Sequence, residues 1–412
     1  MAAVNALGVT ARTAAPARPQ GRAPASAVDL DLPLLIAVIA IASLGLVMVA
    51  STSLGLAERQ FGDPFHFVIR QGIFLVLGAG ALGIVLRVPL VVWERLARPL
   101  FFVTLALLAA VLVPGVGWQV NGSVRWIPLG PLHLQVSELA KFAAVVYLAD
   151  YVVRHAEAVR TTARGFLTPM ALLCVAGLFL LLEPDFGSTG VLMATALGLL
   201  FLAGVRLWQF GLLFLTVSTG LGLLAVLSPY RLARLTSFLN PWADPFSSGF
   251  QLTQALIAIG RGGWLGVGLG NSIQKLFYLP EAHTDFLFSI LAEELGLLGV
   301  VVVVVLFGFV VWRAFRIGRR AERAGQAFGA YLAYGIGLWV GLQAYLNIGV
   351  NLGVLPTKGL TLPLMSYGGS SLLMNCVAIG LLLRVDRETR RIGVGARRVA
   401  AAVAARGRGG RR

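Results

Sequence analysis

The feature that most limits how this chain can fold is a series of apolar segments, each long enough to cross a lipid bilayer. A membrane-spanning helix needs about 20 mainly apolar residues, and the first such run begins at Leu34. The 412 residues are 58% hydrophobic and 13% charged, whereas soluble domains are only about half apolar and about one quarter charged. We therefore predict an all-α fold, a polytopic integral membrane helix bundle.

The apolar runs predict about ten transmembrane helices. A long segment, residues 229–284, separates the seventh from the eighth. The alternation of the spans predicts that it is a large external loop, and connections of this length are usually functional. The expected spans are residues 34–53, 72–86, 99–113, a fourth that includes Glu138 and Tyr147, 168–182, 188–203, a seventh ending near Ser228, 285–312, 328–348 and 364–383.

Charge predicts how the bundle sits in the membrane. The net charge of +16 comes from arginines that gather at both ends of the chain and in alternate connections. Such an excess marks cytoplasmic segments, so we expect both termini inside, with residues 1–31 as a disordered tail and 385–412 as a basic cytoplasmic tail around a transmembrane domain of residues 32–384. A nucleic-acid partner is not expected, because that would need a basic face on a folded domain.

The same topology sends the polar segments that interrupt the spans to the outer side. They are residues 121–126, 183–185, the long loop, Asp285 and residues 351–358. Unrelated loops would not be expected to gather their polar residues in this way. We predict a shared external site covered by the long loop.

Asp285 is the leading candidate within that site. Ionisable side chains are costly at membrane depth and usually face a protein interior or a water-filled cavity. Ser289 and Glu293 follow at i+4 and i+8, on the same helical face. An alternative is that Asp285 only caps its own helix. Glu281 and His283 lie in the same stretch, but four scattered histidines do not indicate a zinc site.

The cations on the outer side would suit an anionic substrate such as a lipid pyrophosphate. They are Arg125, Lys141, Lys358 and Arg261. Lys141 has a second explanation, since Glu138 lies three residues before it on the same helix and the two could pair locally. Arg125 has no acidic neighbour in the sequence, so there the binding role is favoured.

Five motifs in order along the chain carry a family resemblance. They are NGSVRWI at residues 121–127, SELAK at 137–141, EPDFG at 183–187, YLPEAHTDF at 278–286 and PTKGLTLPLMSYGGSS at 356–371. Together they resemble the shape, elongation, division and sporulation (SEDS) family, over residues 34–384. Lys358 within the last motif is similar to the division members of that family and is usually missing from the elongation members.

The resemblance implies a peptidoglycan glycosyltransferase that polymerises lipid II at the outer face of the bacterial inner membrane, at the division septum. It implies that Asp285 is the general base, which deprotonates the sugar 4-hydroxyl of one lipid II as it attacks the anomeric carbon of another, so that undecaprenyl pyrophosphate leaves. The remaining motif residues would bind substrate. In addition to the cations they are Glu138, Glu183, Asp185, Glu281, His283, Ser366 and Ser370.

The resemblance also implies partners, namely a class B penicillin-binding protein that crosslinks the strands and other divisome proteins. A divalent cation, Mg²⁺ or Mn²⁺, could assist, although no ligand cluster in the sequence demands one. The alternative function is a lipid II flippase. Transporter sites usually lie near the membrane midplane between repeated halves, whereas the polar residues here gather at one face, so the enzyme is favoured.

Overall fold

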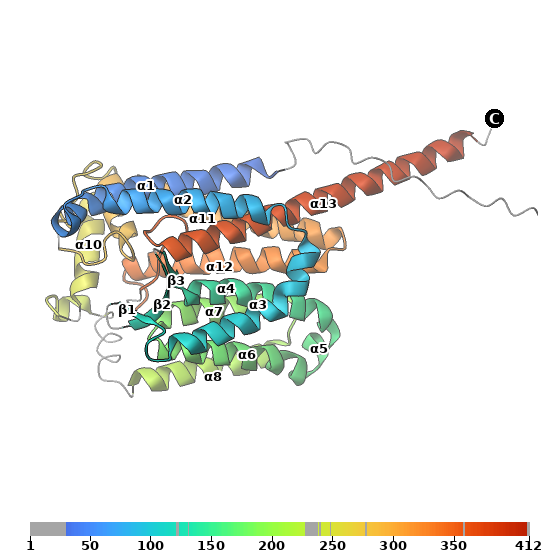
Figure 1. The fold of residues 1–412 in the computed structure, drawn as a ribbon, viewed down its shortest axis with the longest axis horizontal. Coiled ribbons are helices and arrows are strands. Elements are labelled where there is room, and N and C mark those ends of the chain that lie inside the picture. Colours follow the sequence, from blue (N-terminus) through green and yellow to red (C-terminus); the bar gives the residue numbers. More distant parts are fainter. Residues whose placement is uncertain are drawn as a thin grey trace, which may run out of the picture.

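Long helices that run side by side make up most of the molecule (Figure 1). The computed structural model describes residues 30–409 except 121–122, 131, 227–237, 239, 248, 277 and 357–358. The long helices are α1 (Leu32–Phe61), α2 (His66–Val85), α3 (Leu90–Val111), α4 (Val136–Arg154), α6 (Ala163–Leu182), α7 (Phe186–Leu202), α8 (Leu207–Val226), α11 (Leu287–Arg323), α12 (Ala327–Asn351) and α13 (Gly369–Gly409). The prediction of an all-helical, polytopic membrane protein is confirmed.

Composition alone identifies five of the described helices as long and apolar enough to cross a membrane, namely α1, α2, α6, α11 and α13. Others carry polar groups that face the protein interior. In α4, Glu138, Lys141 and Asp150 are all buried, and in α12 the same is true of Gln343 and Asn347. Polar side chains inside a bundle avoid the cost of contact with lipid, which explains why such helices have lower hydropathy.

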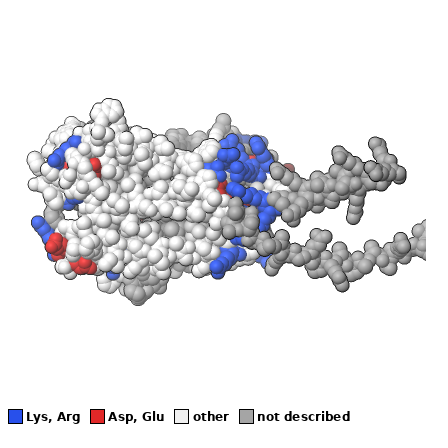
Figure 2. Space-filling view, turned by 90° about the horizontal axis from the view of Figure 1, so that it is seen from above, with Lys and Arg blue, Asp and Glu red and all other residues white. Residues whose placement is uncertain are grey.

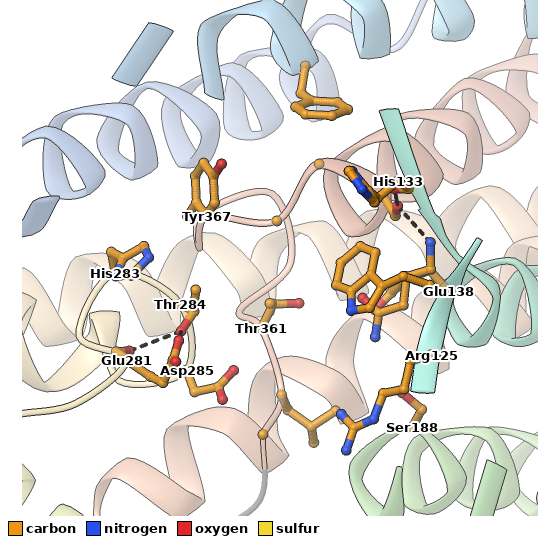
Figure 3. Close-up of a pocket in the computed structure, with 18 of the residues that line it drawn as sticks. Arg125, His133, Glu138, Ser188, Glu281, His283, Thr284, Asp285, Thr361 and Tyr367 are labelled. Carbon is orange, nitrogen blue, oxygen red and sulfur yellow. Dashed lines mark hydrogen bonds between the residues drawn. The ribbon is translucent and has the colours of Figure 1, made fainter. Parts of the chain in front are cut away.

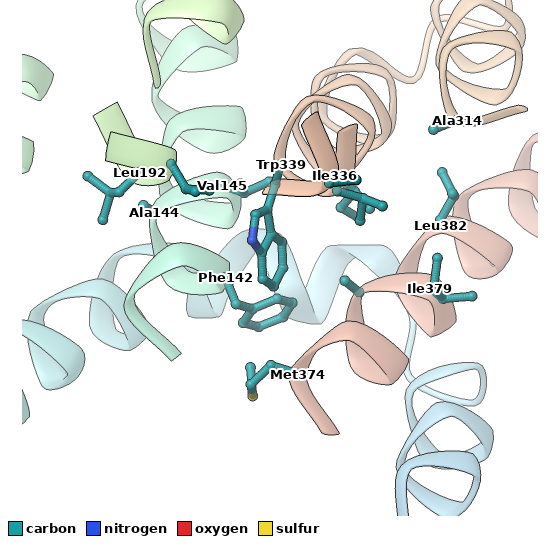
Figure 4. Packing of buried hydrophobic residues seen from close by; sticks show 14 of the residues in the cluster. Phe142, Ala144, Val145, Leu192, Ala314, Ile336, Trp339, Met374, Ile379 and Leu382 are labelled. Carbon is teal, nitrogen blue, oxygen red and sulfur yellow. The ribbon is translucent and has the colours of Figure 1, made fainter. Parts of the chain in front are cut away.

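The core lies between α4, α7, α12 and α13 (Figure 4). Nearly every residue of α4 is buried, so this helix runs through the middle of the bundle. Trp339 of α12 is fully buried and packs beside Phe142 of α4. Its indole Nε1 donates a hydrogen bond to Gln343 Oε1 at 2.9 Å, which satisfies the one polar atom of the ring.

Helix α11 is broken at Gly296, whose φ of 64° is not helical. The backbone of the preceding loop packs into this break: Val267 N donates to Glu293 O at 3.0 Å and Leu297 N donates to Gly263 O at 3.0 Å. A Cβ atom on Gly266 would lie 2.1 Å from Glu294 O, so only glycine permits this close approach. The expected span at residues 285–312 is therefore two helical segments that hold the loop between them.

A small antiparallel sheet, β1–β2–β3, replaces the irregular external loop expected after α3. Its strands are β1 (Trp118–Val120), β2 (Ser123–Leu129) and β3 (Leu132–Gln135). In Figure 1 the sheet lies at the same end of the bundle as α10 (Phe250–Gly262) and the loop that follows it. This end of the molecule is called the loop end below.

Arginines gather at the opposite end of the bundle, where α13 leaves it (Figure 2). This end is called the arginine end below. Helix α13 continues to Gly409, through the segment predicted as a basic tail. Residues 1–29 of the predicted N-terminal tail lie outside the described residues, while Asp31 is buried and caps α1 through a hydrogen bond from Leu34 N at 3.1 Å. The remaining elements are α5 (Ala156–Thr161) and the 3₁₀ helix η1 (Pro241–Ala243).

Candidate active site at the loop end

A cavity of about 940 Å³ opens at the loop end, between the sheet, α2 and the two segments that precede α11 and α13 (Figure 3). Of the residues predicted to form the site, six line it: Arg125, Glu138, Glu281, His283, Asp285 and Ser370. These six residues come from four separate parts of the sequence, around positions 125, 138, 281–285 and 370, and they meet at one cavity.

Asp285 presents its carboxyl group to this cavity and does not cap α11. The residue at the cap position is Phe286, and no side chain makes a capping hydrogen bond there. The Asp285 main-chain carbonyl accepts hydrogen bonds from Asn347 Nδ2 at 2.9 Å and Asn351 Nδ2 at 3.0 Å. A Cβ atom on Gly359 would lie 3.0 Å from Asp285 Oδ2. Because glycine has no side chain, the segment before α13 leaves room for the Asp285 carboxyl group.

The environment of Asp285 raises its pKa to about 7. Burial is the largest cause, because it disfavours the charged form, and the nearby Glu281 carboxylate adds to it. Arg125 acts in the opposite direction and Asp185 in the same direction as Glu281. At neutral pH the carboxyl group is thus divided between its charged and neutral forms, which suits a group that must accept a proton and release it again.

Glu281 and His283 shape the same wall of the cavity. Thr284 Oγ1 donates to Glu281 Oε2 at 2.7 Å, and this bond closes the tight turn in which Glu281 has a φ of 56°. Burial lowers the pKa of His283. Its ring packs against Phe67 of α2 and Tyr367, with centroid distances of 4.8 and 5.5 Å, so His283 joins α2 to the segment before α13.

Arg125 stands on the other side of the cavity, on strand β2. Its guanidinium donates to Glu183 O at 3.2 Å, Pro184 O at 2.8 Å and Ser123 Oγ at 3.1 Å. These partners are carbonyl and hydroxyl oxygens, so they orient the guanidinium without neutralising it. A positive group therefore faces the cavity across from Asp285 (Figure 3).

Glu183 and Asp185 lie behind Arg125, and neither is among the residues that line the cavity. Within the described residues neither carboxylate oxygen of Glu183 has a hydrogen-bond partner. Burial, then the charge of Asp185, raises the pKa of Glu183 to about 8, although Arg125 opposes the rise. Asp185 accepts a hydrogen bond from Ser188 N at 3.0 Å and so caps α7, whose residue Ser188 lines the cavity.

Lys141 is held below the cavity floor. Its Nζ donates to Glu138 Oε1 at 2.9 Å and to Gln343 Oε1 at 2.8 Å, and its side chain is 1% exposed. Glu138 lines the cavity and Lys141 does not. Of the two roles considered for this lysine, the geometry favours the local ion pair.

Arg261 and Glu293 pair with each other at 3.3 Å, away from the cavity. Glu293 also accepts hydrogen bonds from Ile273 N at 3.2 Å and from Ser272 Oγ. Next to it, Glu294 pairs with Lys275 at 2.7 Å. Both carboxylates are buried, as the helical spacing predicted for Glu293. Their partners Arg261, Ser272, Ile273 and Lys275 belong to the long loop, so they anchor it to α11, and Glu294 also accepts a hydrogen bond from Ser51 of α1 at 2.7 Å.

The two serines predicted as binding residues differ in position. Ser370 Oγ donates to His133 O at 2.9 Å and accepts from Gln135 N at 3.0 Å, which joins α13 to strand β3 beside the cavity. Ser366 Oγ accepts a hydrogen bond from Leu362 N at 2.9 Å. Ser366 is buried and does not line the cavity. Lys358 lies outside the described residues.

Comparison with known proteins identifies the family. The family model described as cell cycle protein, FtsW/RodA/SpoVE, matches residues 32–391. The chain belongs to the FtsW/RodA/SpoVE family. It is 63% identical over 360 residues to the probable peptidoglycan glycosyltransferase FtsW of Thioalkalivibrio sulfidiphilus, covering 87% of this chain and 90% of that protein. It is 58% identical over 359 residues to the probable peptidoglycan glycosyltransferase FtsW of Coxiella burnetii, covering 87% of this chain and 96% of that protein.

Solved structures of this family share the fold. One chain of a peptidoglycan synthase complex superimposes with a TM-score of 0.71 at 32% identity, covering 88% of this chain and 99% of that chain. The rod shape determining protein RodA of Thermus thermophilus superimposes with a TM-score of 0.64 at 30% identity, covering 88% and 98%. The predicted family is confirmed. SEDS and FtsW/RodA/SpoVE are two names for the same family, the first taken from the roles of its members.

Several residues of this family member that line the cavity were not predicted from the sequence. They are Arg70, His133, Ser188, Gln251, Thr361 and Tyr367, among others. Arg70 did carry a signal, because it is an arginine on the predicted outer side, against the general distribution of positive charge. His133 carried none, since its position depends on the pairing of strands β2 and β3.

Proposed function

We propose that this chain is a peptidoglycan glycosyltransferase that polymerises lipid II into glycan strands. The observation that carries the proposal is the Asp285 carboxyl group, which lines a cavity of about 940 Å³ with a pKa of about 7. The FtsW proteins with which the chain shares more than half of its residues over 360 positions carry the same activity in their names.

The proposed reaction uses the two sides of the cavity differently. Ionised Asp285 accepts the proton from the sugar 4-hydroxyl of one lipid II, and the oxygen attacks the anomeric carbon of the other. The bond from that carbon to the pyrophosphate oxygen breaks, and undecaprenyl pyrophosphate leaves with the bonding electrons. The Arg125 guanidinium, held by main-chain carbonyls, stabilises the negative charge that develops on the leaving group.

A flippase is the second function considered. A transporter would place its binding site near the midplane, where both sides can reach it in turn. The cavity here lies at the loop end and is walled by the sheet and by loop residues, and this position favours chemistry on one side of the membrane.

A divalent cation, Mg²⁺ or Mn²⁺, remains part of the proposal as an assisting ion. Among the described residues no group of three or more His, Cys, Asp or Glu side chains could hold a metal ion. Mg²⁺ is commonly bound by one or two carboxylates together with substrate phosphates. The Glu281 carboxylate, which lines the cavity, would supply the protein's share, and the pyrophosphate would supply the rest.

We further propose the setting in which the chain works. The arginine end would face the cytoplasm, with both termini there, and the loop end would face outward from the bacterial inner membrane at the septum. A class B penicillin-binding protein would crosslink the strands alongside other divisome proteins. In support, one of the similar structures is a synthase complex in which polymerization and crosslinking are coordinated.

The test is lipid II polymerisation by the purified chain with its crosslinking partner. Asp285→Asn keeps the shape of the side chain but removes the base, and we expect glycan synthesis to fall by about 10²- to 10⁴-fold. Asp63→Asn is the matched control, since Asp63 is an exposed aspartate before α2 whose side chain accepts a hydrogen bond from Phe65 N at 3.0 Å. Equal glycan yield from the native chain and Asp285→Asn would contradict the proposal.

A further inference from the structure

A basic hollow lies at the arginine end, on the C-terminal part of α11. It encloses about 320 Å³ and is lined by Trp312, Arg316, Arg319, Arg320 and Arg323. The reaction proposed above takes place at the other end of the bundle and uses none of these residues. Four arginines held close together repel one another, so their arrangement calls for a negative partner.

The arginines of this hollow have little internal compensation. Arg320 lies 3.4 Å from Asp386, and its side chain remains 36% exposed. Arg316 stacks over the Trp312 ring at 5.2 Å, a contact that leaves its charge intact. Within the part of the chain that the structure describes, no carboxylate forms an ion pair with Arg316, Arg319 or Arg323. By contrast Arg313, which does not line the hollow, is buried and paired with Asp31.

The hollow continues an exposed apolar stripe of the same helix. Leu298, Val302, Val305 and Trp312 are 63%, 44%, 60% and 46% exposed. Their spacing of three, four or seven residues places them on one face of α11, and Arg316, Arg319 and Arg323 extend that face by the same steps. The face therefore changes from apolar to basic at Trp312, and tryptophan commonly sits at the level of lipid headgroups.

We propose that this hollow binds the phosphate headgroup of an anionic phospholipid, with the acyl chains lying along the exposed stripe of α11. Guanidinium groups bind phosphate oxygens in pairs of parallel hydrogen bonds, and basic pockets at this membrane level are suited to such headgroups. The apolar stripe selects a lipid over free phosphate, because only a lipid fills both parts of the face. The proposal requires only that the arginine end lies at a bilayer surface, and not that the glycosyltransferase activity is correct.

The test is native mass spectrometry of the full chain, released from detergent in the presence of phosphatidylglycerol, cardiolipin or phosphatidylcholine. The test variant is Arg316→Gln/Arg319→Gln/Arg323→Gln. The matched control is Arg87→Gln/Arg95→Gln/Arg164→Gln, which removes the same charge from exposed arginines that line no described cavity. We expect at least a tenfold loss of retained phosphatidylglycerol or cardiolipin in the test variant and less than a twofold loss in the control.

Three outcomes would overturn the proposal. Equal losses in the two triple variants would show that net charge alone attracts the lipid. Retention of phosphatidylcholine as strong as that of the anionic lipids would show that the arginines do not select the headgroup. Displacement of the bound lipid by millimolar inorganic phosphate would identify a site for free phosphate. Unfolding temperatures measured in lipid-free detergent identify variants that are misfolded, and conservative Arg→Lys replacements at the same three positions then take their place.

Discussion

The buried pair of Glu138 and Lys141 offers a direct test of whether the lysine serves the structure or the substrate. The two side chains are 5% and 1% exposed, and Lys141 Nζ lies 2.9 Å from Glu138 Oε1. Lys141→Met keeps an unbranched apolar chain and removes the charge. Because Glu138 Oε2 has no hydrogen-bond partner among the described residues, the carboxylate would lose its main source of compensation.

Removing one partner of a buried ion pair costs about 3–5 kcal/mol. We expect about 3 kcal/mol, the low end, for two reasons. Glu138 lines the cavity, where water can reach it, and Gln343 Oε1 keeps the Trp339 indole as a donor at 2.9 Å. Adding Glu138→Gln to Lys141→Met should recover more than half of the loss, since replacing both charges of such a pair is often nearly neutral.

The assay is thermal unfolding in detergent. Unfolding is monitored with a fluorogenic thiol reagent that reacts with Cys376 when the bundle opens. Cys376 is buried and Cys174 is exposed, so all variants carry Cys174→Ser to remove the background. A lower unfolding temperature for Lys141→Met, and its recovery in the double variant, is the expected result. An unchanged unfolding temperature combined with weaker lipid II binding would refute the reasoning and assign the ammonium group to the substrate.

Two further predictions concern the cavity. Polymerisation should increase with pH through a midpoint at about 7, because Asp285 must be ionised to accept a proton and its pKa is raised to about 7. Glu281→Gln removes one cause of that rise and should move the midpoint of the rate profile to lower pH, and an unmoved midpoint would contradict this. Arg125→Ala should weaken lipid II binding about tenfold to hundredfold, the equivalent of one or two charged hydrogen bonds. The control in the equilibrium binding assay is Arg95→Ala, at an exposed arginine of α3, and equal affinity for the two variants would assign Arg125 only to holding the Glu183 turn.

The sequence predicted the helices and the side of the molecule that carries the site, because both depend on long apolar runs and on charge. It could not predict which polar residues meet. Lys141 and Gln343 are 202 positions apart, and their 2.8 Å hydrogen bond depends on how α4 packs on α12. The spacing of Asp285, Ser289 and Glu293 indicated one interior face, yet the three side chains have different surroundings. Asp285 lines the cavity, Ser289 hydrogen-bonds to Asn351, and Glu293 accepts a hydrogen bond from the long loop.

The sheet was missed for a related reason. Its strands are three, seven and four residues long, and segments this short carry too few side chains for an alternating pattern to stand out. Arg125 therefore had a predicted charge role but no predicted direction. Pairing of β2 with its neighbours, and the carbonyls of residues 183 and 184, supply that direction.

The cavity lies at the end of the bundle away from the arginines, and this has a consequence for how the reaction is powered. If the loop end faces outward, as proposed, the site would have no access to nucleoside triphosphates, which are confined to the cytoplasm. Each sugar must therefore arrive already activated, with its free energy stored in the bond to the lipid pyrophosphate.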